Sequence, residues 1–324
     1  MVTNLLKCRL SGETLARAVV RLAILLIVLG NARAALSQQN AAEEAAARRA
    51  VLARLPPDAA KRVFGSATTP APGPADAIGT FTKGCLAGAV ELPADGPNWQ
   101  VMRPSRNRAW GHPLTIGFIE KLAAAGAGLG WPGLLVGDIG QPRGGPMLTG
   151  HSSHQMGLDA DLWLTPMPEQ RLAPAERDEM RAADVVAESG DDIDPQRWRP
   201  EHRKLIEAAA HEPGVDRIFV NPAIKRELCR EAGREAAADH GWLRLIRPWW
   251  GHNYHFHTRL GCPGGDPECH NPVPPPPPGD GCGKELDWWF TPEAKHPEPG
   301  PERKPLRVAD LPARCAALAP PHGP

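Results

Sequence analysis

Short apolar stretches and longer amphipathic ones follow one another along the middle of the chain. Strand-like patterns mark residues 99–104, 133–140, 158–164 and 216–221, and helical periodicity marks residues 114–128, 174–188, 200–211 and 222–240. The two kinds of segment do not alternate regularly, which argues against a doubly wound parallel fold. We therefore predict an α+β fold, a small antiparallel sheet flanked by helices and long loops.

The two ends of the chain differ from this middle part. Basic residues precede the apolar run 22–30, and Ala32-Arg33-Ala34 after it has the small-x-small pattern of a signal cleavage site. No later stretch is apolar for about 18 residues, so no membrane span is expected after cleavage. Alanine and then proline dominate the following segment, and proline dominates the C-terminal end. We therefore expect a signal peptide, a flexible lead, a catalytic domain and a Pro-rich extension, at residues 1–34, 35–80, 81–290 and 291–324.

The charge balance argues against nucleic-acid binding, and the cysteine count is typical of an exported protein with disulfides. The chain has 37 basic and 37 acidic residues, and cleavage after Ala34 would remove five basic residues but only one acidic one. The mildly acidic remainder argues against a nucleic-acid partner, because phosphates are bound by clustered lysines and arginines. Cleavage would also remove Cys8 from the seven cysteines. An even number in an exported chain predicts three disulfides that staple the fold, although spacing alone leaves about fifteen pairings.

Histidines and aspartates gather in GHSSHQMGLDADLW, residues 150–163. In an extended LDADLW, Asp159 and Asp161 point to the same face of the strand. Gly157 allows the chain to turn just before this strand. The turn and the strand can thus bring His154 and Asp161 together.

A second histidine-rich segment is RPWWGHNYHFHTRLGC, residues 247–262. His255 and His257 would face the same side of a strand, and His252 precedes them on a turn. An isolated His-x-His or Asp-x-Asp is typical of a solvated strand, but five of the twelve histidines lie in these two short segments. Nitrogen and carboxylate ligands without a thiolate favour a catalytic Zn²⁺ site, which keeps one position open for water.

These segments carry a family resemblance. GDIGQPRGGPMLTGHSSHQMGLDADLW (137–163) and WWGHNYHFHTRLGCP (249–263) closely resemble the penicillin-insensitive murein endopeptidases. These are periplasmic zinc enzymes related to lysostaphin-type peptidases and D-alanyl-D-alanine carboxypeptidases. The resemblance covers roughly residues 80–290. It implies hydrolysis of the D-alanyl to meso-diaminopimelyl amide that cross-links the peptides of peptidoglycan.

The resemblance also implies roles for individual residues. It makes His154, Asp161 and His257 the zinc ligands and His255 the general base for the attacking water. The further active-site histidines, which orient substrate or stabilise the oxyanion, are His151 and His252. The family's disulfides would pair Cys85 with Cys315, Cys229 with Cys282 and Cys262 with Cys269.

Other residues near the motifs allow more than one interpretation. We interpret Asp159 as orienting a histidine and not as a fourth ligand. Arg143, in the turn QPRGGPM, either holds a carboxylate of the peptide or braces its own loop. Trp288 and Trp289 are expected to serve core or domain packing and not to stack on sugars.

Two other functions fit the same residues. One is a D-alanyl-D-alanine carboxypeptidase that trims uncross-linked stems, and the other is a non-catalytic module that binds peptidoglycan or carries zinc. All the expected zinc ligands and the adjacent general base are present, which disfavours the non-catalytic module. The sequence does not indicate an oligomeric state.

Overall fold

The computed structural model describes residues 46, 50–235, 239–298, 300 and 304–320. Contacts divide the chain into two units, Met1–Ala50 and Val51–Pro324. The predicted signal peptide lies outside the described residues. Among the helices that are described, none is long and apolar enough to cross a membrane.

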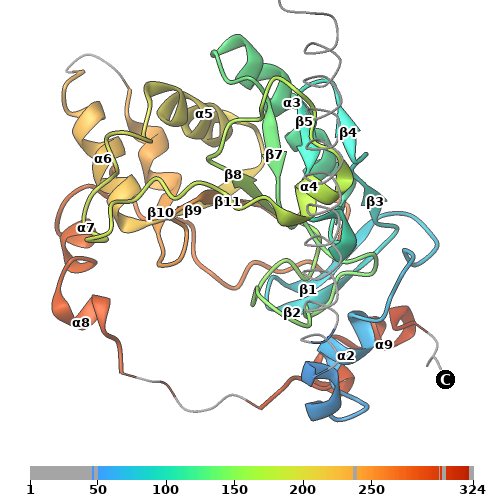
Figure 1. The fold of residues 1–324 in the computed structure, drawn as a ribbon. Coiled ribbons are helices and arrows are strands. Elements are labelled where there is room, and N and C mark those ends of the chain that lie inside the picture. Colours follow the sequence, from blue (N-terminus) through green and yellow to red (C-terminus); the bar gives the residue numbers. More distant parts are fainter. Residues whose placement is uncertain (1–45, 47–49, 236–238, 299, 301–303, 321–324) are drawn as a thin grey trace, which may run out of the picture. The chain divides into compact units, whose positions relative to one another are not determined.

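A seven-stranded sheet forms the centre of the second unit (Figure 1). Its strands, in spatial order, are β10 (Ile246–Pro248), β9 (Val215–Val220), β11 (His255–Leu260), β8 (Asp159–Trp163), β7 (Leu134–Val136), β5 (Trp99–Val101) and β4 (Asp95–Gly96). The predicted α+β class is confirmed, and the central pairs of the sheet are antiparallel. The outer pairs β9–β10 and β5–β7 are parallel. Parallel neighbours need a crossover, which α6 (Pro222–Ala232) and α3 (Pro113–Gly128) provide.

The helices match the predicted segments to different degrees. α5 (Pro200–His211) has the predicted bounds, whereas the prediction for residues 174–188 is wrong beyond α4 (Pro174–Glu179). There the amide of Val185 donates to the carbonyl of Asn253, and Val186 pairs with Ile193 in an isolated bridge. These tertiary contacts hold the segment out of the helix that its own periodicity favours.

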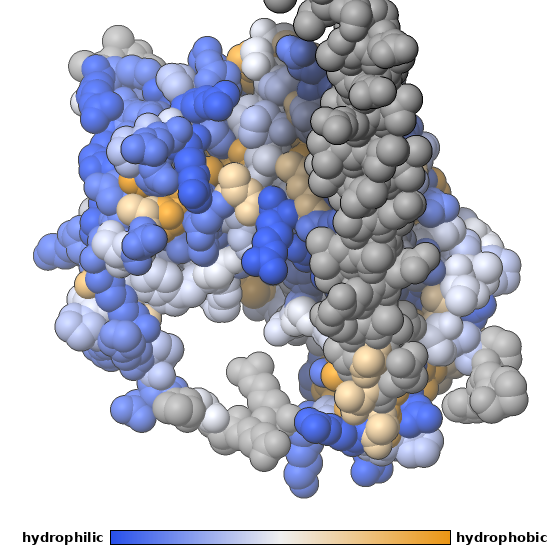
Figure 2. All heavy atoms as spheres, viewed as in Figure 1, coloured by the Kyte–Doolittle hydropathy of each residue, from blue (hydrophilic) through white to orange (hydrophobic). Residues whose placement is uncertain are grey.

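Apolar packing on one face of the sheet fixes the register of the central strands. Leu162 of β8 and Phe256 of β11 are fully buried in a core that includes Ile119 and Leu122 of α3 and Leu205 of α5. A slip of one residue would drive the charged side chains of these strands into that core. The visible face of the unit is largely hydrophilic, with hydrophobic residues only in small patches (Figure 2).

The segments on either side of the predicted catalytic domain also pack together. α2 (Ala60–Phe64) and α9 (Ala313–Leu318) lie near the hairpin of β1 (Asp76–Thr80) and β2 (Lys83–Ala87) (Figure 1). Phe64, Ile78 and Leu311 belong to one buried cluster there. Parts of the expected flexible lead and Pro-rich extension thus have fixed structure, because their apolar side chains are buried.

The remaining elements are β3 (Val90–Glu91), β6 (Trp110–Gly111), α7 (Lys284–Trp288), α8 (Pro292–Lys295), and the 3₁₀ turns η1 (Pro104–Arg106), η2 (Gly241–Leu245) and η3 (Val308–Asp310).

The unit has three disulfides among the described residues, and they are the pairs that the resemblance implied. Cys85 of β2 is joined to Cys315 of α9, and Cys262 to Cys269 in the loop after β11. Cys229 of α6 is joined to Cys282, just before α7. The first of these links attaches the end of the chain to the hairpin.

Gly157 makes the turn into β8, as its position predicts. Its φ is +67°, and a Cβ there would lie 2.4 Å from Cδ2 of Leu86 and 2.9 Å from the amide nitrogen of His112. We expect Gly157→Ala to lower the free energy of unfolding in urea by about 2–5 kcal/mol, because left-handed backbone costs about 1–2 kcal/mol and overpacking about 1–3 kcal/mol. Gly190→Ala is the matched control, since Gly190 has φ +73° and nothing within 4 Å of the added Cβ. Equal losses in the two variants would contradict the steric argument.

Candidate metal centre

The pairing of β8 with β11 places the predicted site residues across from one another. His257 is the register partner of Asp161, and Arg259 is the register partner of Asp159. His255 lies two residues before His257 and therefore on the same face of the sheet. The side chains of these strands alternate between the two faces of the sheet: Asp159, Asp161, His255 and His257 point to one face, and Leu162 and Phe256 point to the apolar core on the other.

His154 approaches this face from the turn before β8. Its φ is +63°, a conformation that costs a non-glycine residue about 1–2 kcal/mol. Two hydrogen bonds hold it there: its backbone amide donates to Oδ2 of Asp159 at 2.9 Å, and its Nδ1–H donates to the carbonyl of Ile139 at 2.8 Å. The remaining ring nitrogen, Nε2, is thereby directed toward Asp161.

Donor atoms from three segments converge on one carboxylate oxygen. Nε2 of His154 and Nδ1 of His257 each lie 3.4 Å from Oδ1 of Asp161. Two ligands bound at about 2.1 Å to a tetrahedral ion are about 3.4 Å apart. Within the described part of the chain, Nε2 of His154 and Oδ1 of Asp161 are buried and have no hydrogen-bond partner. The spacing, the unpartnered atoms and the imidazole and carboxylate donors all fit a zinc ion.

Asp159 supports this cluster from behind. Its Oδ1 accepts hydrogen bonds from Nε2–H of His257 at 2.8 Å and from Nε–H of Arg259 at 2.7 Å. The first bond leaves Nδ1 of His257 as the atom that faces Asp161. The predicted position of Asp159 next to a histidine is thus present, and Arg259, which balances its charge, was missed by the sequence reasoning.

The protonation states follow from burial and from the two aspartates. Burial alone would lower the pKa of His154, but the carboxylates of Asp161 and Asp159 outweigh it and raise this pKa to about 9. Burial dominates at the other two imidazoles and lowers the pKa of His257 to about 4 and that of His255 to about 3. Burial alone would raise the pKa of Asp161, yet the surrounding histidines hold it well below its ordinary range. At neutral pH the cluster therefore contains an ionised Asp161, a protonated His154 and two neutral imidazoles.

His151 lies at the rim of the cluster and contacts a second carboxylate. Its Nε2 is 3.0 Å from Oδ2 of Asp138 and 3.4 Å from Oδ2 of Asp161. Among the described residues, His151, His154 and Asp161 are the group of three whose donor atoms all lie within 4.8 Å of one another. Asp138 is also bound by Arg108 at 2.9 Å. Neither Asp138 nor Arg108 was predicted, and an acidic residue within the apolar run 133–140 was the only available signal.

A cavity of about 430 Å³ opens beside the cluster and gives it access to solvent. His151, His252 and His257 are among the residues that line it. The Nδ1–H of His252 donates to the carbonyls of Trp249 and Trp250 at 3.3 and 3.1 Å, and its ring centre is 4.9 Å from that of His255. Burial lowers the pKa of His252. Three of the five histidines of the two motifs thus line one accessible space.

Arg143 has contacts of a different kind. Its guanidinium donates to the backbone carbonyl of Thr69 at 3.1 Å and to that of Leu318 at 3.0 Å. These bonds tie the turn QPRGG to the segments near α2 and α9. They favour the loop-bracing role over the binding of a peptide carboxylate.

Comparison with known proteins agrees with the geometry. The family model described as penicillin-insensitive murein endopeptidase matches residues 77–319, a range that includes both histidine segments and extends past residue 290 to the end of α9. Relatives named penicillin-insensitive murein endopeptidase, from Citrobacter koseri and Escherichia coli, are each 45% identical over 258 residues. Each alignment covers 79% of this chain and 90% of the relative. The chain therefore belongs to the penicillin-insensitive murein endopeptidase family.

Proposed function

We propose that this protein is a zinc-dependent murein DD-endopeptidase that hydrolyses the D-alanyl to meso-diaminopimelyl cross-link of peptidoglycan. The observation that carries the proposal is the convergence of His154 Nε2 and His257 Nδ1 on Oδ1 of Asp161, each at 3.4 Å, beside an open cavity. The names of the relatives supply the substrate class. The predicted signal peptide and the disulfides support action in the periplasm.

We assign the ligands to His154, Asp161 and His257, and not to the group that contains His151. The Nε2 of His151 is already 3.0 Å from a carboxylate oxygen of Asp138. His257 instead donates its Nε2–H to Asp159 and keeps Nδ1 for the ion. A carboxylate behind a histidine in this way orients the ring and raises its basicity toward a metal.

The other histidines can move protons and hold charge. When bound, zinc would supply a Lewis acid that makes a water molecule acidic near neutral pH and polarises the scissile carbonyl. His255 has Nε2 3.6 Å from Asp161 and is neutral, so it can accept the proton of the attacking water. The protonated ring can then pass this proton to the leaving amine. We assign the orientation of the substrate and the stabilisation of the oxyanion to His151 and His252, which line the cavity.

Digestion of purified substrates tests this function against its rivals. The protein is incubated with a cross-linked muropeptide dimer and with an uncross-linked pentapeptide stem, and the products are identified by mass spectrometry. We expect monomers from the dimer, loss of activity with a chelator and recovery with zinc. Release of D-alanine from the pentapeptide alone would assign the protein to the carboxypeptidases, and no turnover of either would assign it to the non-catalytic modules.

Zinc binding is expected to release a proton from His154. With a pKa of about 9 this imidazole is protonated at neutral pH, whereas His257, with a pKa of about 4, is not. At a pH between about 4 and about 9, zinc must displace the proton of His154 in order to bind. The affinity of the site for zinc should therefore fall about tenfold for each unit by which the pH drops below 9. Competition with a chelating dye at pH 6, 7 and 8 measures this slope. His151→Gln should show the same dependence of zinc affinity on pH. An affinity that does not change with pH would contradict the assignment of His154 as a ligand.

A further inference from the structure

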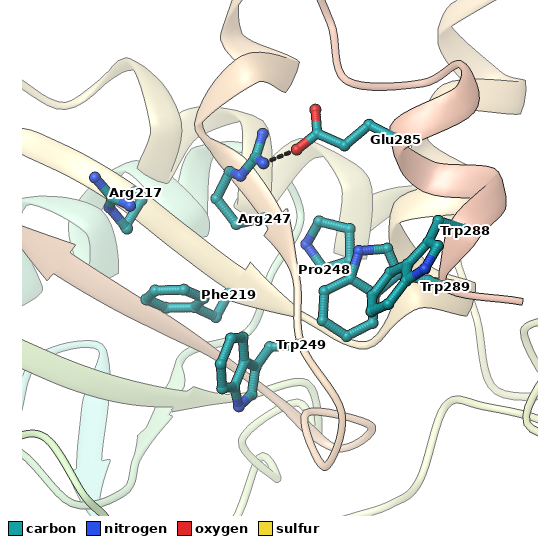
Figure 3. A pocket seen from close by; sticks show the side chains of 8 residues that line it. All are labelled: Arg217, Phe219, Arg247, Pro248, Trp249, Glu285, Trp288 and Trp289. Carbon is teal, nitrogen blue, oxygen red and sulfur yellow. Dashed lines mark hydrogen bonds and ion pairs between the residues drawn. The ribbon is translucent and has the colours of Figure 1, made fainter. Parts of the chain in front are cut away.

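A second cavity, of about 440 Å³, is drawn in Figure 3 and shares lining residues with the cavity beside the metal centre. We call it the aromatic cavity, because Trp288 and Trp289 at the end of α7 face Phe219 and Trp249 across it. Phe219 and Trp249 also line the cavity beside the metal centre. The two spaces are therefore neighbouring parts of one surface groove.

The sheet itself connects the two spaces. Asp161 pairs with His257, His257 pairs with Phe219, and Phe219 pairs with Arg247, so one row crosses four adjacent strands. Neighbouring strands are about 4.8 Å apart, which puts Arg247 about 10 Å from His257. A ligand held at the metal centre can thus extend along this row into the aromatic cavity.

The indoles of this cavity are partly exposed. Trp288 retains 47% of its accessible surface and Trp249 retains 56%. Of the two expected roles for Trp288, core or domain packing, the core position is wrong. The ring of Trp289 lies 5.4 Å from that of Trp288 and 6.2 Å from that of Trp249. The disulfide of Cys282 fixes the start of α7 to α6. The protein therefore holds aromatic surface in the open, where it can stack against the apolar C–H face of a sugar ring.

The charges in the aromatic cavity are already compensated. Arg217 donates to Oδ2 of Asp216 at 2.6 Å and to the carbonyl of Pro274 at 3.0 Å. Arg247 is paired with Glu285 (Figure 3). Paired guanidinium and carboxylate groups suit the hydroxyl and acetamido groups of a neutral ligand better than a free carboxylate.

A third cavity, which shares His151 with the cavity beside the metal centre, differs in charge from the aromatic cavity. It has a volume of about 430 Å³, and Lys61, Lys83 and Lys304 are among the residues that line it. Carboxylates of a stem peptide would be attracted to these amines. The difference between the two cavities assigns a neutral part of the substrate to the aromatic one.

We propose that the aromatic cavity is a subsite for a sugar ring of the glycan strand that carries the cleaved stem peptide. This inference rests on the proposed murein endopeptidase function. A stem of about four residues spans at most about 14 Å, which agrees with the separation of about 10 Å from His257 to Arg247 and a further step to the indoles. The subsite would make the enzyme prefer cross-links that are still attached to glycan.

The test compares one cross-linked dimer in two forms, with its disaccharides and after an amidase has removed them. We expect Trp288→Ala to lower kcat/KM about tenfold on the glycan-bearing dimer and to leave it within about twofold on the glycan-free dimer. Trp288→Phe should recover part of the loss. Leu114→Ala is the matched control, because Leu114 is 50% exposed on α3 and lines neither cavity.

Each other outcome overturns the inference in a recognisable way. An equal loss on both forms of the dimer would assign the cavity to the stem peptide, and no loss on either form would remove it from substrate binding. Wild-type protein that cleaves neither form would refute the murein endopeptidase function itself, and the subsite with it. Thermal unfolding of Trp288→Ala, expected at the wild-type midpoint, separates loss of binding from loss of fold.

Discussion

Alanine at His257 is expected to abolish both zinc retention and digestion of cross-linked muropeptides. His257 supplies one of the converging donor atoms, and Asp159 holds its ring in place. Loss of an outer hydrogen-bond partner costs about 10–100-fold in metal affinity, and loss of a ligand must cost more. Activity should therefore fall to the level of the chelator-treated wild type. His154→Ala is expected to behave in the same way.

Metal content per protein, determined by atomic emission after dialysis, is the direct measurement. His211→Ala is the control, because His211 is exposed on α5 and outside the cluster. It should keep both metal and activity. A His257→Ala protein that digests the dimer at the wild-type rate would remove the basis of the hydrolytic mechanism.

Alanine at His255 is expected to have a different signature. We predict that kcat falls by about 10²–10⁴-fold, the usual contribution of a general base, while zinc is retained. The reason is geometric: His255 lies on the same strand face as His257, but it pairs with Trp163 and not with Asp161. It is therefore two residues further from the turn that carries His154, and its Nδ1 has no hydrogen-bond partner among the described residues. Such a ring is available for proton transfer.

Added imidazole provides the readout that a structural role would not affect. It should restore part of the activity of His255→Ala and none of that of His257→Ala. Loss of zinc from His255→Ala would show that this histidine is a ligand, and the assignment of the base would then be wrong.

Local periodicity predicted β8, and the spacing of His255 and His257 indicated that both would face one side if β11 were a strand. Periodicity could not predict that the two strands pair. That His154, Asp161 and His257 would share one site was implied by the family resemblance. The parallel edges of the sheet were missed, because β5 and β9 return to their neighbours through α3 and α6 and such crossovers leave no mark in local alternation.

Asp138, which contacts His151, could not be predicted as a site residue from the sequence either. Asp138 and Arg108 are separated by 30 residues, and each stands alone among unrelated neighbours. The left-handed backbone of His154 was equally hidden, because residues of that type rarely adopt it and only the bonds to Asp159 and Ile139 hold it there.

The link between Cys85 and Cys315 has a consequence for how the molecule is made. Its two ends are separated by 230 positions, so the hairpin acquires its covalent partner only after a long intervening stretch of chain has been synthesised. A variant without Cys315 would keep a reactive thiol on β2, and a variant without α9 would leave the apolar cluster around Phe64 partly uncovered. Covalent closure of the hairpin thus depends on a helix that lies far from it in the sequence.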